Sequence, residues 1–580
     1  MTSQEKVGGA GAADPEEGPL RLQQPQDDHA RSDWERETAA VLRKGRRLAE
    51  DAADDAVWAT LTRTTLDGVP ITPLGTPDLV ESLVTAGRPT REGAWDVRSA
   101  LGPGVTDAVR NEESLAELET GATSLWLTVD ADTDFATLLR GVFLDLAPVV
   151  LETRDAAGAL AAARAYLAHL AAEHVTAHAG TNLGVPAELA GTPEAVEVAT
   201  AARQAGILAF VVDGTAVHDR GASDAQELGH VLRVGAEYLR ALTGAGLDVA
   251  TAASLVEFRL AATDEQFPTI AKLRAVRRLW ARVLELSGVA EPAPMRLHVV
   301  TSRPMMSRYD PYVNMLRGTV AAFAAGVAGA DALTVLPFDA PLGRPEAFGR
   351  RIARNTSALL IEESHVAVVT DPAGGSYHVE KLTDDVAVAG WTFFGELEAG
   401  ASLDDAVAAT VAERDRLVAT RARPITGLTE FPNLAEELPQ RTPDGLFDAV
   451  RSYGASFEAL RDAPASQPVF LATLGPIAAH TARATFASNL FAAGGIGVEV
   501  AGATADADAL VAAYGGQSVV CLAGADTAYA AWGQAAAEAL RAAGATHVII
   551  AGKPTDYADD SCAMGLDALA FLTRTREKLS

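Results

Sequence analysis

Short apolar runs alternate with helical stretches from about residue 120 to residue 380. Eight of these runs have the length and the β-branched content of buried strands. They are Ser124–Val129, Pro148–Glu152, Thr181–Val185, Ile207–Val212, Ser254–Leu260, Arg296–Thr301, Ala332–Leu336 and His365–Thr370. Eight strands that alternate with helices over about 250 residues predict an α/β fold of the (β/α)8, or TIM barrel, type.

The clearest pattern lies in the stretch from Phe348 to Leu382. Apolar residues at 348, 352, 359 and 360 recur at helical spacing, and Val366, Val368 and Val369 then form a β-branched run. Turn residues follow from position 371 to position 375, and a further helical pattern begins at Tyr377. This stretch predicts a helix, a buried strand and a second helix.

A second set of strands begins near residue 467. Each is closed by a glycine and followed by a helical pattern, and they are Val469–Leu474, Gly497–Ala501, Ser518–Ala523 and Thr546–Ala551. The alternation predicts a flavodoxin-like, doubly wound sheet, in which ligands usually bind beyond the carboxyl ends of the strands.

The remaining segments suggest the domain organisation. We expect a disordered tail at 1–31, a helical arm for subunit contact at 32–75, the barrel at 76–425, a proline-punctuated linker at 426–466 and the second domain at 467–580.

A Ser-x-x-Glu capping box from Ser32 to Glu35 is expected to open the arm's first helix. Trp34 and Trp58 lie on this arm. They can pack on the chain's own core or against a partner chain, because aromatic residues are enriched at both.

Composition excludes several classes of protein. The chain has 580 residues, a net charge of −29 and a pI near 4.8, which argues against a nucleic-acid-binding surface. Cys521 and Cys562 are the two cysteines, too few for a disulfide framework or a Cys-rich metal site. No apolar run is long enough to span a membrane and no signal-type segment opens the chain, so we expect a cytoplasmic protein.

Arg351-Ile-Ala-Arg-Asn-Thr356, followed by Asp371-Pro-x-x-Gly-Ser-Tyr377, resembles the last barrel units of the cobalamin-dependent acyl-CoA mutases, the methylmalonyl-CoA mutase family. Thr65–Leu74 and Arg423–Pro432 resemble the segments by which that family enters and leaves its barrel. The resemblance implies a barrel followed by a domain of the cobalamin-binding type. It also implies the radical interconversion of (R)-methylmalonyl-CoA and succinyl-CoA with adenosylcobalamin.

The family coordinates cobalt through an Asp-x-His-x-x-Gly loop after the first strand of the second domain. Here the loop is Gly475-Pro-Ile-Ala-Ala-His-Thr-Ala-Arg483. Counting back from Gly495, His480 takes the histidine position, Ala478 the carboxylate position and Arg483 the glycine position. Counting forward from Gly475, Ala479 takes the histidine position. Without a carboxylate to orient it, His480 is a poor candidate ligand, and we favour a helix-start or surface histidine.

The substrate positions of the family also lack their residues. Gly214-Thr-Ala216 stands where the family has Gly-Tyr-His, and His218 follows two positions later. Asp331 takes the place of a glutamine that reaches the substrate carboxylate, and Asp130–Asp134 replaces a tyrosine region. The apolar side chains of 297–300 and 333–336 are expected to fill the barrel axis and to leave no tunnel for a coenzyme A arm.

Three further patterns have both a structural and a functional interpretation. We expect Gly494–Gly497 to end a helix and not to form a phosphate loop. Asp559-Asp560 is expected to be a solvated acidic pair and not a metal site. The arginines at 274, 278 and 282 could bind phosphate, but such a row is more often a solvated helix face.

We therefore expect a non-catalytic chain that works as the partner of a homologous, catalytic large chain. The adenosylcobalamin of the pair is expected in that large chain, with no catalytic residue, cofactor or metal in this one and no nucleic acid or membrane partner. One alternative is a self-sufficient acyl-CoA mutase in which His480 binds cobalt and His218 or His298 replaces the missing histidine. Another is a scaffold that binds neither substrate nor cofactor.

Overall fold

The computed structural model describes residues 29–83 and 87–579. These form two compact units, one of residues 29–65 with 70–74 and one of residues 66–69 with the described residues from 75 onward. Residues 1–28 of the predicted disordered tail, 1–31, lie outside the described residues. The last residue of this tail, Arg31, already begins helix α1.

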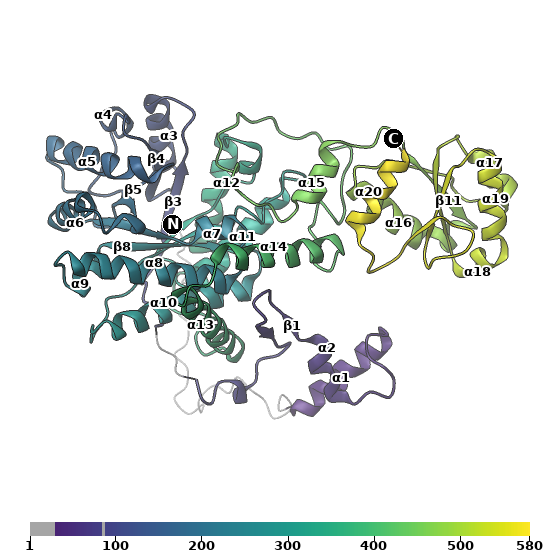
Figure 1. Cartoon of the computed structure of the whole chain (residues 1–580), viewed down its shortest axis with the longest axis horizontal. Helices are drawn as coiled ribbons and strands as arrows, with labels where there is room; N and C mark the ends of the chain where they lie inside the picture. The colour runs from purple at the N-terminus through teal and green to yellow at the C-terminus, as the bar shows by residue number, and fades with distance from the viewer. Residues whose placement is uncertain (1–28, 84–86, 580) are drawn as a thin grey trace, which may run out of the picture. The chain divides into compact units, whose positions relative to one another are not determined.

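The first unit is a small helical arm with a two-stranded ribbon (Figure 1). Its elements are α1 (Arg31–Lys44), the 3-10 turn η2 (Asp54–Ala56), α2 (Val57–Leu61), β1 (Arg63–Thr64) and β2 (Pro70–Ile71). The carboxylate of Asp33 accepts a hydrogen bond from the Ala30 amide at 3.0 Å, so the helix starts one residue before the predicted capping box. The prediction that Ser32 caps this helix is wrong.

Trp34 and Trp58 pack on each other inside this arm, with ring centroids 4.7 Å apart. The Trp58 indole N–H donates to Glu35 at 2.6 Å, and the Arg31 guanidinium lies 4.2 Å from the Trp58 ring centroid. Both indoles remain partly exposed, and Val41 on α1 is 70% exposed.

Eight parallel strands close into a barrel in the order β10-β3-β4-β5-β6-β7-β8-β9. The strands are β3 (Asp96–Leu101), β4 (Ser124–Val129), β5 (Val149–Thr153), β6 (Asn182–Pro186), β7 (Leu208–Asp213), β8 (Val256–Ala262), β9 (Leu297–Thr301) and β10 (Ala332–Thr334). The predicted TIM barrel is confirmed, and seven of its strands lie where the apolar runs placed them.

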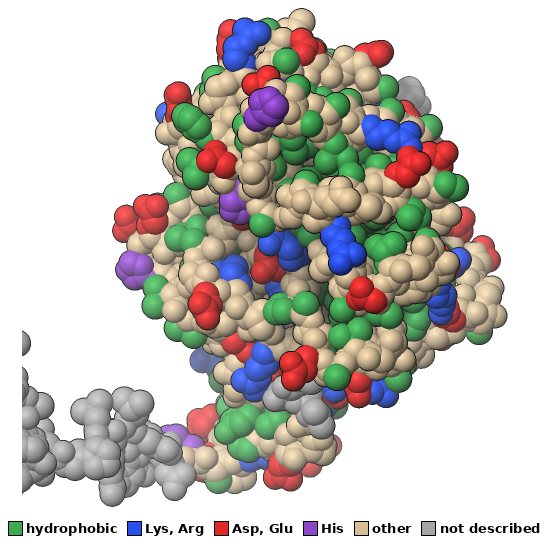
Figure 2. Space-filling model, turned by 90° about the vertical axis from the view of Figure 1, so that its left-hand side faces the viewer, with side chains coloured by type: hydrophobic (Ala, Val, Ile, Leu, Met, Phe, Trp, Pro, Cys, Tyr) green, Lys and Arg blue, Asp and Glu red, His purple; other side chains and the backbone are tan. Residues whose placement is uncertain are grey.

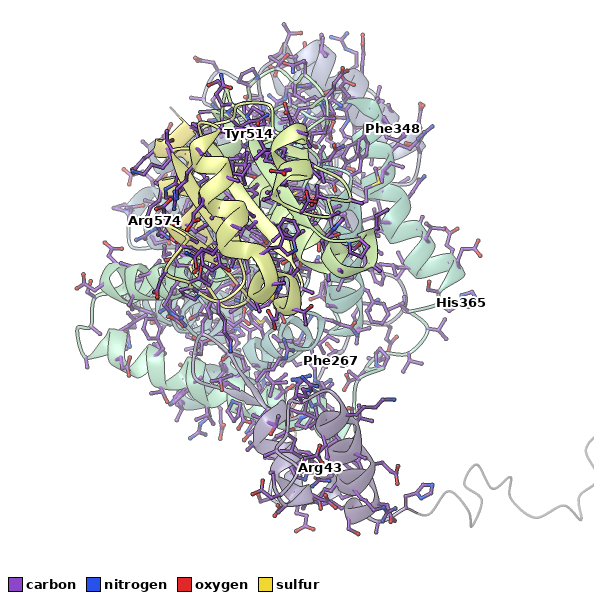
Figure 3. All side chains as sticks on the ribbon, turned by 90° about the vertical axis from the view of Figure 1, so that its right-hand side faces the viewer. Arg43, Phe267, Phe348, His365, Tyr514 and Arg574 are labelled. Carbon is purple, nitrogen blue, oxygen red and sulfur yellow. The ribbon has the colours of Figure 1, made fainter. Side chains whose placement is uncertain are left out.

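The eighth predicted strand, at 365–370, is wrong. This segment forms turns in which Val368 and Val369 are 77% and 56% exposed, and His365 has a positive φ of 54°. In Figure 3, His365 lies on a loop at the edge of the unit. Strand β3 closes the barrel between β10 and β4 instead, with the Asp96 amide bonded to the Asp331 carbonyl oxygen at 2.9 Å.

Helices cover the outside of the barrel (Figure 1). They are α3 (Asp107–Glu119), α4 (Phe135–Leu138), α5 (Ala156–Glu173), α6 (Pro193–Ala205), α7 (Thr215–Asp219), α8 (Asp224–Gly244), α9 (Val249–Ser254), α10 (Gln266–Leu286), α11 (Val313–Val327), α12 (Ala347–Ala358), α13 (Tyr377–Glu398) and α14 (Leu403–Ala419). The 3-10 turns η3 (Pro77–Leu79), η4 (Ala187–Leu189) and η5 (Ala340–Leu342) and the π turn η6 (Leu359–Glu363) complete this region. Helix α15 (Ala455–Asp462) packs against the second domain.

The second sheet has the strand order β12-β11-β13-β14-β15, which is the flavodoxin-like order. Its strands are β11 (Val469–Leu474), β12 (Val498–Val500), β13 (Val519–Gly524), β14 (His547–Ala551) and β15 (Asp560–Cys562). The four predicted strands are confirmed, and β15 was missed because its three residues are too short and polar to form an apolar run.

Helices cover both faces of this sheet (Figure 1). Alternate strand residues face α16 (Ile477–Ala493) and α20 (Ala568–Leu579) on one side. The others face α17 (Ala507–Ala513) and α19 (Gln534–Ala542) on the opposite side. Helix α18 (Asp526–Ala528) and the π turn η7 (Tyr529–Gly533) lead into α19.

Acidic and basic side chains are interspersed over the face that Figure 2 shows. In the described part of the chain, no helix has the length and apolar character that crossing a membrane requires.

Candidate functional site

The interior of the barrel is crossed by charged side chains from non-adjacent strands. Arg98 on β3 bonds Glu257 on β8 at 2.9 Å, and Arg259 on β8 bonds Glu152 on β5 at 2.9 Å. Neither pair belongs to neighbouring strands, so each contact runs through the barrel axis. We predicted that apolar side chains fill the barrel axis. This prediction is wrong about the kind of side chain, because ion pairs occupy much of that space.

His298 lies among these ion pairs and has no exposed surface. Arg259 Nε donates to its Nδ1 at 3.3 Å, so the ring proton is on Nε2, which donates to the Thr334 hydroxyl at 2.8 Å. Burial, together with the nearby arginines, holds the pKa of His298 well below its usual value. With Trp126 packed edge-on against it at 5.2 Å, this neutral imidazole fills the axis.

A segment of the predicted linker covers the carboxyl ends of several barrel strands. We call residues 441–447 the strap. Its Arg441 bonds Asp339 at 2.7 Å after β10, the carbonyl of its Asp444 accepts from Arg154 after β5, and its Leu446 lies against Gly102 after β3. The strap therefore lies across the barrel mouth, where active sites of this fold are built.

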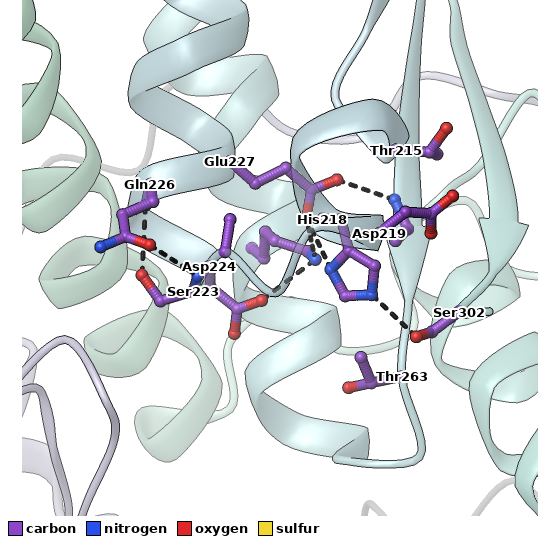
Figure 4. Close-up of polar contacts among 12 residues, drawn as sticks. Thr215, His218, Asp219, Ser223, Asp224, Gln226, Glu227, Thr263 and Ser302 are labelled. Atoms are coloured by element: carbon purple, nitrogen blue, oxygen red, sulfur yellow. Dashed lines mark hydrogen bonds and ion pairs between the residues drawn. The ribbon is translucent and has the colours of Figure 1, made fainter. Parts of the chain in front are cut away.

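His218, on α7, belongs to a buried polar cluster that includes Glu227 on α8 and Ser302 after β9 (Figure 4). Its Nε2 lies 2.7 Å from the Ser302 hydroxyl, and its Nδ1 lies 3.6 Å from the carboxylate of Glu227. Ser, His and Glu in this order have the composition of a nucleophilic triad. All three are at least 98% buried, however, and the distance from His218 to Glu227 is too long for a hydrogen bond.

Glu227 is instead committed to a buried ion pair. Lys272 Nζ lies 2.7 Å from Glu227 and 3.0 Å from Asp224, and the Ala261 amide donates to Glu227 at 2.8 Å. Burial alone would raise the pKa of Glu227, but Lys272 and His218 lower it from 4.5 to about 2. We interpret the cluster as a structural joint between α8, α10 and β8.

This pair predicts acid sensitivity. A carboxylate whose pKa is lower in the folded state stabilises the fold above the unfolded pKa, and this contribution is lost as the pH falls from about 4.5 towards 2. The shift corresponds to about 3 kcal/mol. In native-state hydrogen exchange of the barrel amides, Glu227→Gln should flatten the loss of local stability between pH 5 and pH 2. The exposed Glu237→Gln should not, and equal slopes for both variants would contradict the assignment.

His480 lies in the first turn of α16 and is 94% buried. Its Nδ1 lies 3.2 Å from the Gly475 carbonyl oxygen. Two residues, Gly475 and Pro476, separate β11 from α16, so the helix begins where the family has its cobalt-binding loop. No carboxylate is hydrogen-bonded to this imidazole in the described residues.

Arg483 and Tyr529 fill the carboxyl edge of the second sheet. Arg483 donates to the Gly524 carbonyl and to Asp526, and its guanidinium lies 4.9 Å from the Tyr529 ring centroid. The Tyr529 hydroxyl accepts from the Gly524 amide at 3.0 Å and donates to the Ala551 carbonyl at 2.9 Å. These contacts join the ends of β13 and β14 at the edge where this fold usually holds a ligand.

The other predicted substrate positions lie at different ends of the barrel. Asp331 precedes β10, bonds Arg277 at 2.9 Å and accepts from the Leu297 amide, so it lies at the amino end of the strands with its charge compensated. Thr215, in the run that replaces Gly-Tyr-His, donates to Asp213 at the end of β7. Asp130–Asp134 forms an exposed turn before α4.

The structure also shows the surroundings of the glycine, arginine and aspartate patterns noted in the sequence. Gly494 follows α16, so the helix exit is confirmed. Arg274 and Arg278 bond carboxylates of the segment 371–384 and are not a solvated face, whereas Arg282 is half exposed and pairs with Glu285. Asp559 and Asp560 pair with arginines, and the described residues contain no group of three or more potential metal ligands.

Several residues of the site were missed from the sequence. The strand 256–260 alternates apolar residues with Glu257 and Arg259, and this alternation marks one polar face. In a closed barrel, that face is the axis. No comparable signal marks the strap or Tyr529, because each gains its role from contacts distant in sequence.

Comparison with known proteins agrees with this architecture. A family model described as "Methylmalonyl-CoA mutase" matches residues 199–437. The methylmalonyl-CoA mutase small subunit of Streptomyces virginiae is 43% identical over 95% of this chain and 97% of its own length. That of Propionibacterium freudenreichii subsp. shermanii is 34% identical over 94% of each. A methylmalonyl-CoA mutase of Cereibacter sphaeroides is 36% identical over 34% of this chain and 28% of its own length.

Proposed function

Because the chain belongs to the methylmalonyl-CoA mutase family, we propose that it is the small, non-catalytic subunit of a heterodimeric mutase. Its partner is a homologous large chain that binds adenosylcobalamin and isomerises (R)-methylmalonyl-CoA and succinyl-CoA. The cofactor supplies radical chemistry in that chain. The names of the relatives at 43% and 34% identity support this assignment.

The observation that carries the proposal is the filled carboxyl edge of the second sheet. A cobalamin lying there needs an open loop after the first strand and a free edge. This chain has a helix that begins two residues after β11, and Arg483 and Tyr529 occupy the edge through contacts to Gly524 and Ala551. His480 points its Nδ1 at a backbone carbonyl and lacks a carboxylate to orient it.

The barrel supports the same conclusion. A coenzyme A arm that runs along the axis requires free space there, whereas His298, Arg98 and Arg259 cross it in satisfied contacts. The strap lies over the mouth. Without substrate access, the chain's remaining role in the pair is structural, and it contributes surface to the large chain.

Cobalamin binding tests this proposal directly. The purified chain is mixed with adenosylcobalamin, desalted and measured by absorbance. We expect no retained cobalamin, for the parent chain and for His480→Ala alike. Cobalamin that is retained by the parent chain and lost in His480→Ala would make His480 a cobalt ligand and contradict the proposal.

We further propose that the arm contacts the large chain. Val41 is 70% exposed, and the Trp34–Trp58 pair of the same arm is only partly buried. Val41→Asp should weaken heterodimer formation at least tenfold, because a carboxylate would be desolvated at an apolar contact.

The matched control is Val109→Asp on α3, a valine 40% exposed outside the arm, which should leave the heterodimer intact. Affinity is measured by titrating each variant into the large chain. Circular dichroism of the variants checks that the arm's helices are retained. Equal affinities for Val41→Asp and the parent chain would show that this face of the arm makes no contact.

A further inference from the structure

A small cavity remains under the strap at the carboxyl end of the barrel. Its volume is about 50 Å³. A single buried water requires a cavity of roughly 10–15 Å³, so this cavity has room for about four non-hydrogen atoms. Its walls include the apolar side chains of Ala100, Leu336, Pro337 and Leu446.

One polar group in the cavity wall has no partner. Trp126 is 97% buried and lines the cavity, and its indole N–H makes no hydrogen bond within the described part of the chain. An unsatisfied buried donor costs free energy, whereas almost all buried N–H groups in native proteins are paired. The indole N–H is therefore an unused donor of a side chain that lines the cavity.

Arg303 lines the same cavity beside Trp126. Its guanidinium carbon lies 5.9 Å from the Trp126 ring centroid, and among the described residues it donates one hydrogen bond, to Asp219 at 2.8 Å. A guanidinium carries five N–H donors, so donors remain for a ligand. Arg344 and Arg350 at the rim are committed to Glu113.

Two acidic residues, Glu152 and Asp444, line the cavity. Glu152 bonds Arg259 at 2.9 Å, and Asp219, which does not line the cavity, holds Arg303 in place. Asp444 of the strap also lines the cavity, and its carboxylate accepts from the Leu446 amide at 3.0 Å.

We propose that this cavity binds a short-chain monocarboxylate of about the size of acetate. The carboxylate accepts hydrogen bonds from the Trp126 indole N–H and the remaining N–H groups of Arg303, an arrangement of charge-assisted bonds. The methyl end lies against Leu336 and Leu446. This site is independent of the proposed subunit role, because it requires neither cobalamin nor a partner chain.

The test is titration of the full-length chain with acetate, followed by ligand-observed NMR. We expect saturable binding that weakens at least tenfold in Trp126→Phe, which retains the ring and loses the donor. Trp34→Phe, in the arm, is the matched control and should bind acetate as the parent chain does. Acetamide, uncharged and of equal size, should bind at least tenfold more weakly than acetate, and hexanoate should not compete because its chain exceeds the volume of the cavity.

A second variant keeps the test decisive if Trp126→Phe folds poorly. Leu446→Trp enlarges a side chain on the strap, outside the barrel strands, and should abolish acetate binding by filling the cavity. Absence of saturable acetate binding to the parent chain up to about 100 mM would overturn the proposal, since this corresponds to less than about 1.4 kcal/mol of binding free energy. Binding that Leu446→Trp or Trp126→Phe leaves unchanged would overturn it as well.

Discussion

Replacing Lys272 by methionine is expected to lower the free energy of unfolding of the barrel by about 3–5 kcal/mol, because it leaves the Glu227 carboxylate buried without its cation. Neither side chain of this pair has exposed surface, and Nζ lies 2.7 Å from the carboxylate oxygen. Burial opposes the charge of Lys272, but Asp224 and Glu227 raise its pKa above the ordinary value. The pair is therefore charged on both sides in the folded protein.

The matched control is Lys381→Met. Lys381 pairs with Asp385 one helical turn away, and its side chain is a third exposed, so its loss should cost about 0.5 kcal/mol or less. Native-state hydrogen exchange of the barrel amides measures both effects locally, since a chain of this size does not unfold in two states.

The double variant Lys272→Met with Glu227→Gln separates charge from packing. It removes the uncompensated carboxylate and should recover part of the stability that Lys272→Met loses. A Lys272→Met variant that resembles Lys381→Met would show that water reaches Glu227 and that the cluster is not a buried ion pair.

Gly184→Ala is expected to cost about 3 kcal/mol or more. Gly184 lies in β6 with a φ of 68°, at the irregularity between Asn182 and Val185. A Cβ there would lie 1.8 Å from the Leu151 carbonyl oxygen of β5. The left-handed conformation costs about 1–2 kcal/mol, and the clash with backbone forces the two strands apart at a further cost of about 1–3 kcal/mol.

Gly206→Ala is the matched control for this substitution. Gly206 follows α6 with a φ of 70°, and a Cβ added there meets nothing within 4 Å. Its cost should be the conformational part alone, about 1 kcal/mol. Native-state hydrogen exchange of the barrel amides gives the comparison for both variants. Equal losses would show that β5 and β6 can separate freely at this point, against the packed barrel wall described above.

The apolar pattern predicted the barrel because seven of its strands lie in short runs rich in apolar residues. It misplaced the eighth because Arg98 and Ser99 interrupt β3, whereas Val366, Val368 and Val369 looked like a strand. Arg98 is tolerated in β3 because Glu257, on a distant strand, neutralises it inside the barrel. Pairing between positions 159 residues apart leaves no local signal in the sequence.

The fold of the second domain was easier to predict from the sequence. Its four predicted strands lie in runs rich in apolar residues, and each is followed by an amphipathic or Ala-rich helix, so pattern and structure agree. The absence of an Asp-x-His-x-x-Gly loop was also readable, whereas the side chains that fill the sheet edge were not. Tyr529 reaches Gly524 and Ala551 only because η7 folds back over the ends of β13 and β14.

The central claim is that this chain is the non-catalytic member of a mutase pair. The most direct measurement is mutase activity and retained cobalamin for this chain purified alone and co-purified with its homologous large chain. We predict neither cobalamin nor turnover for the chain alone, and turnover with a single equivalent of cobalamin for the pair. Turnover by this chain alone, with bound cobalamin, would contradict the account.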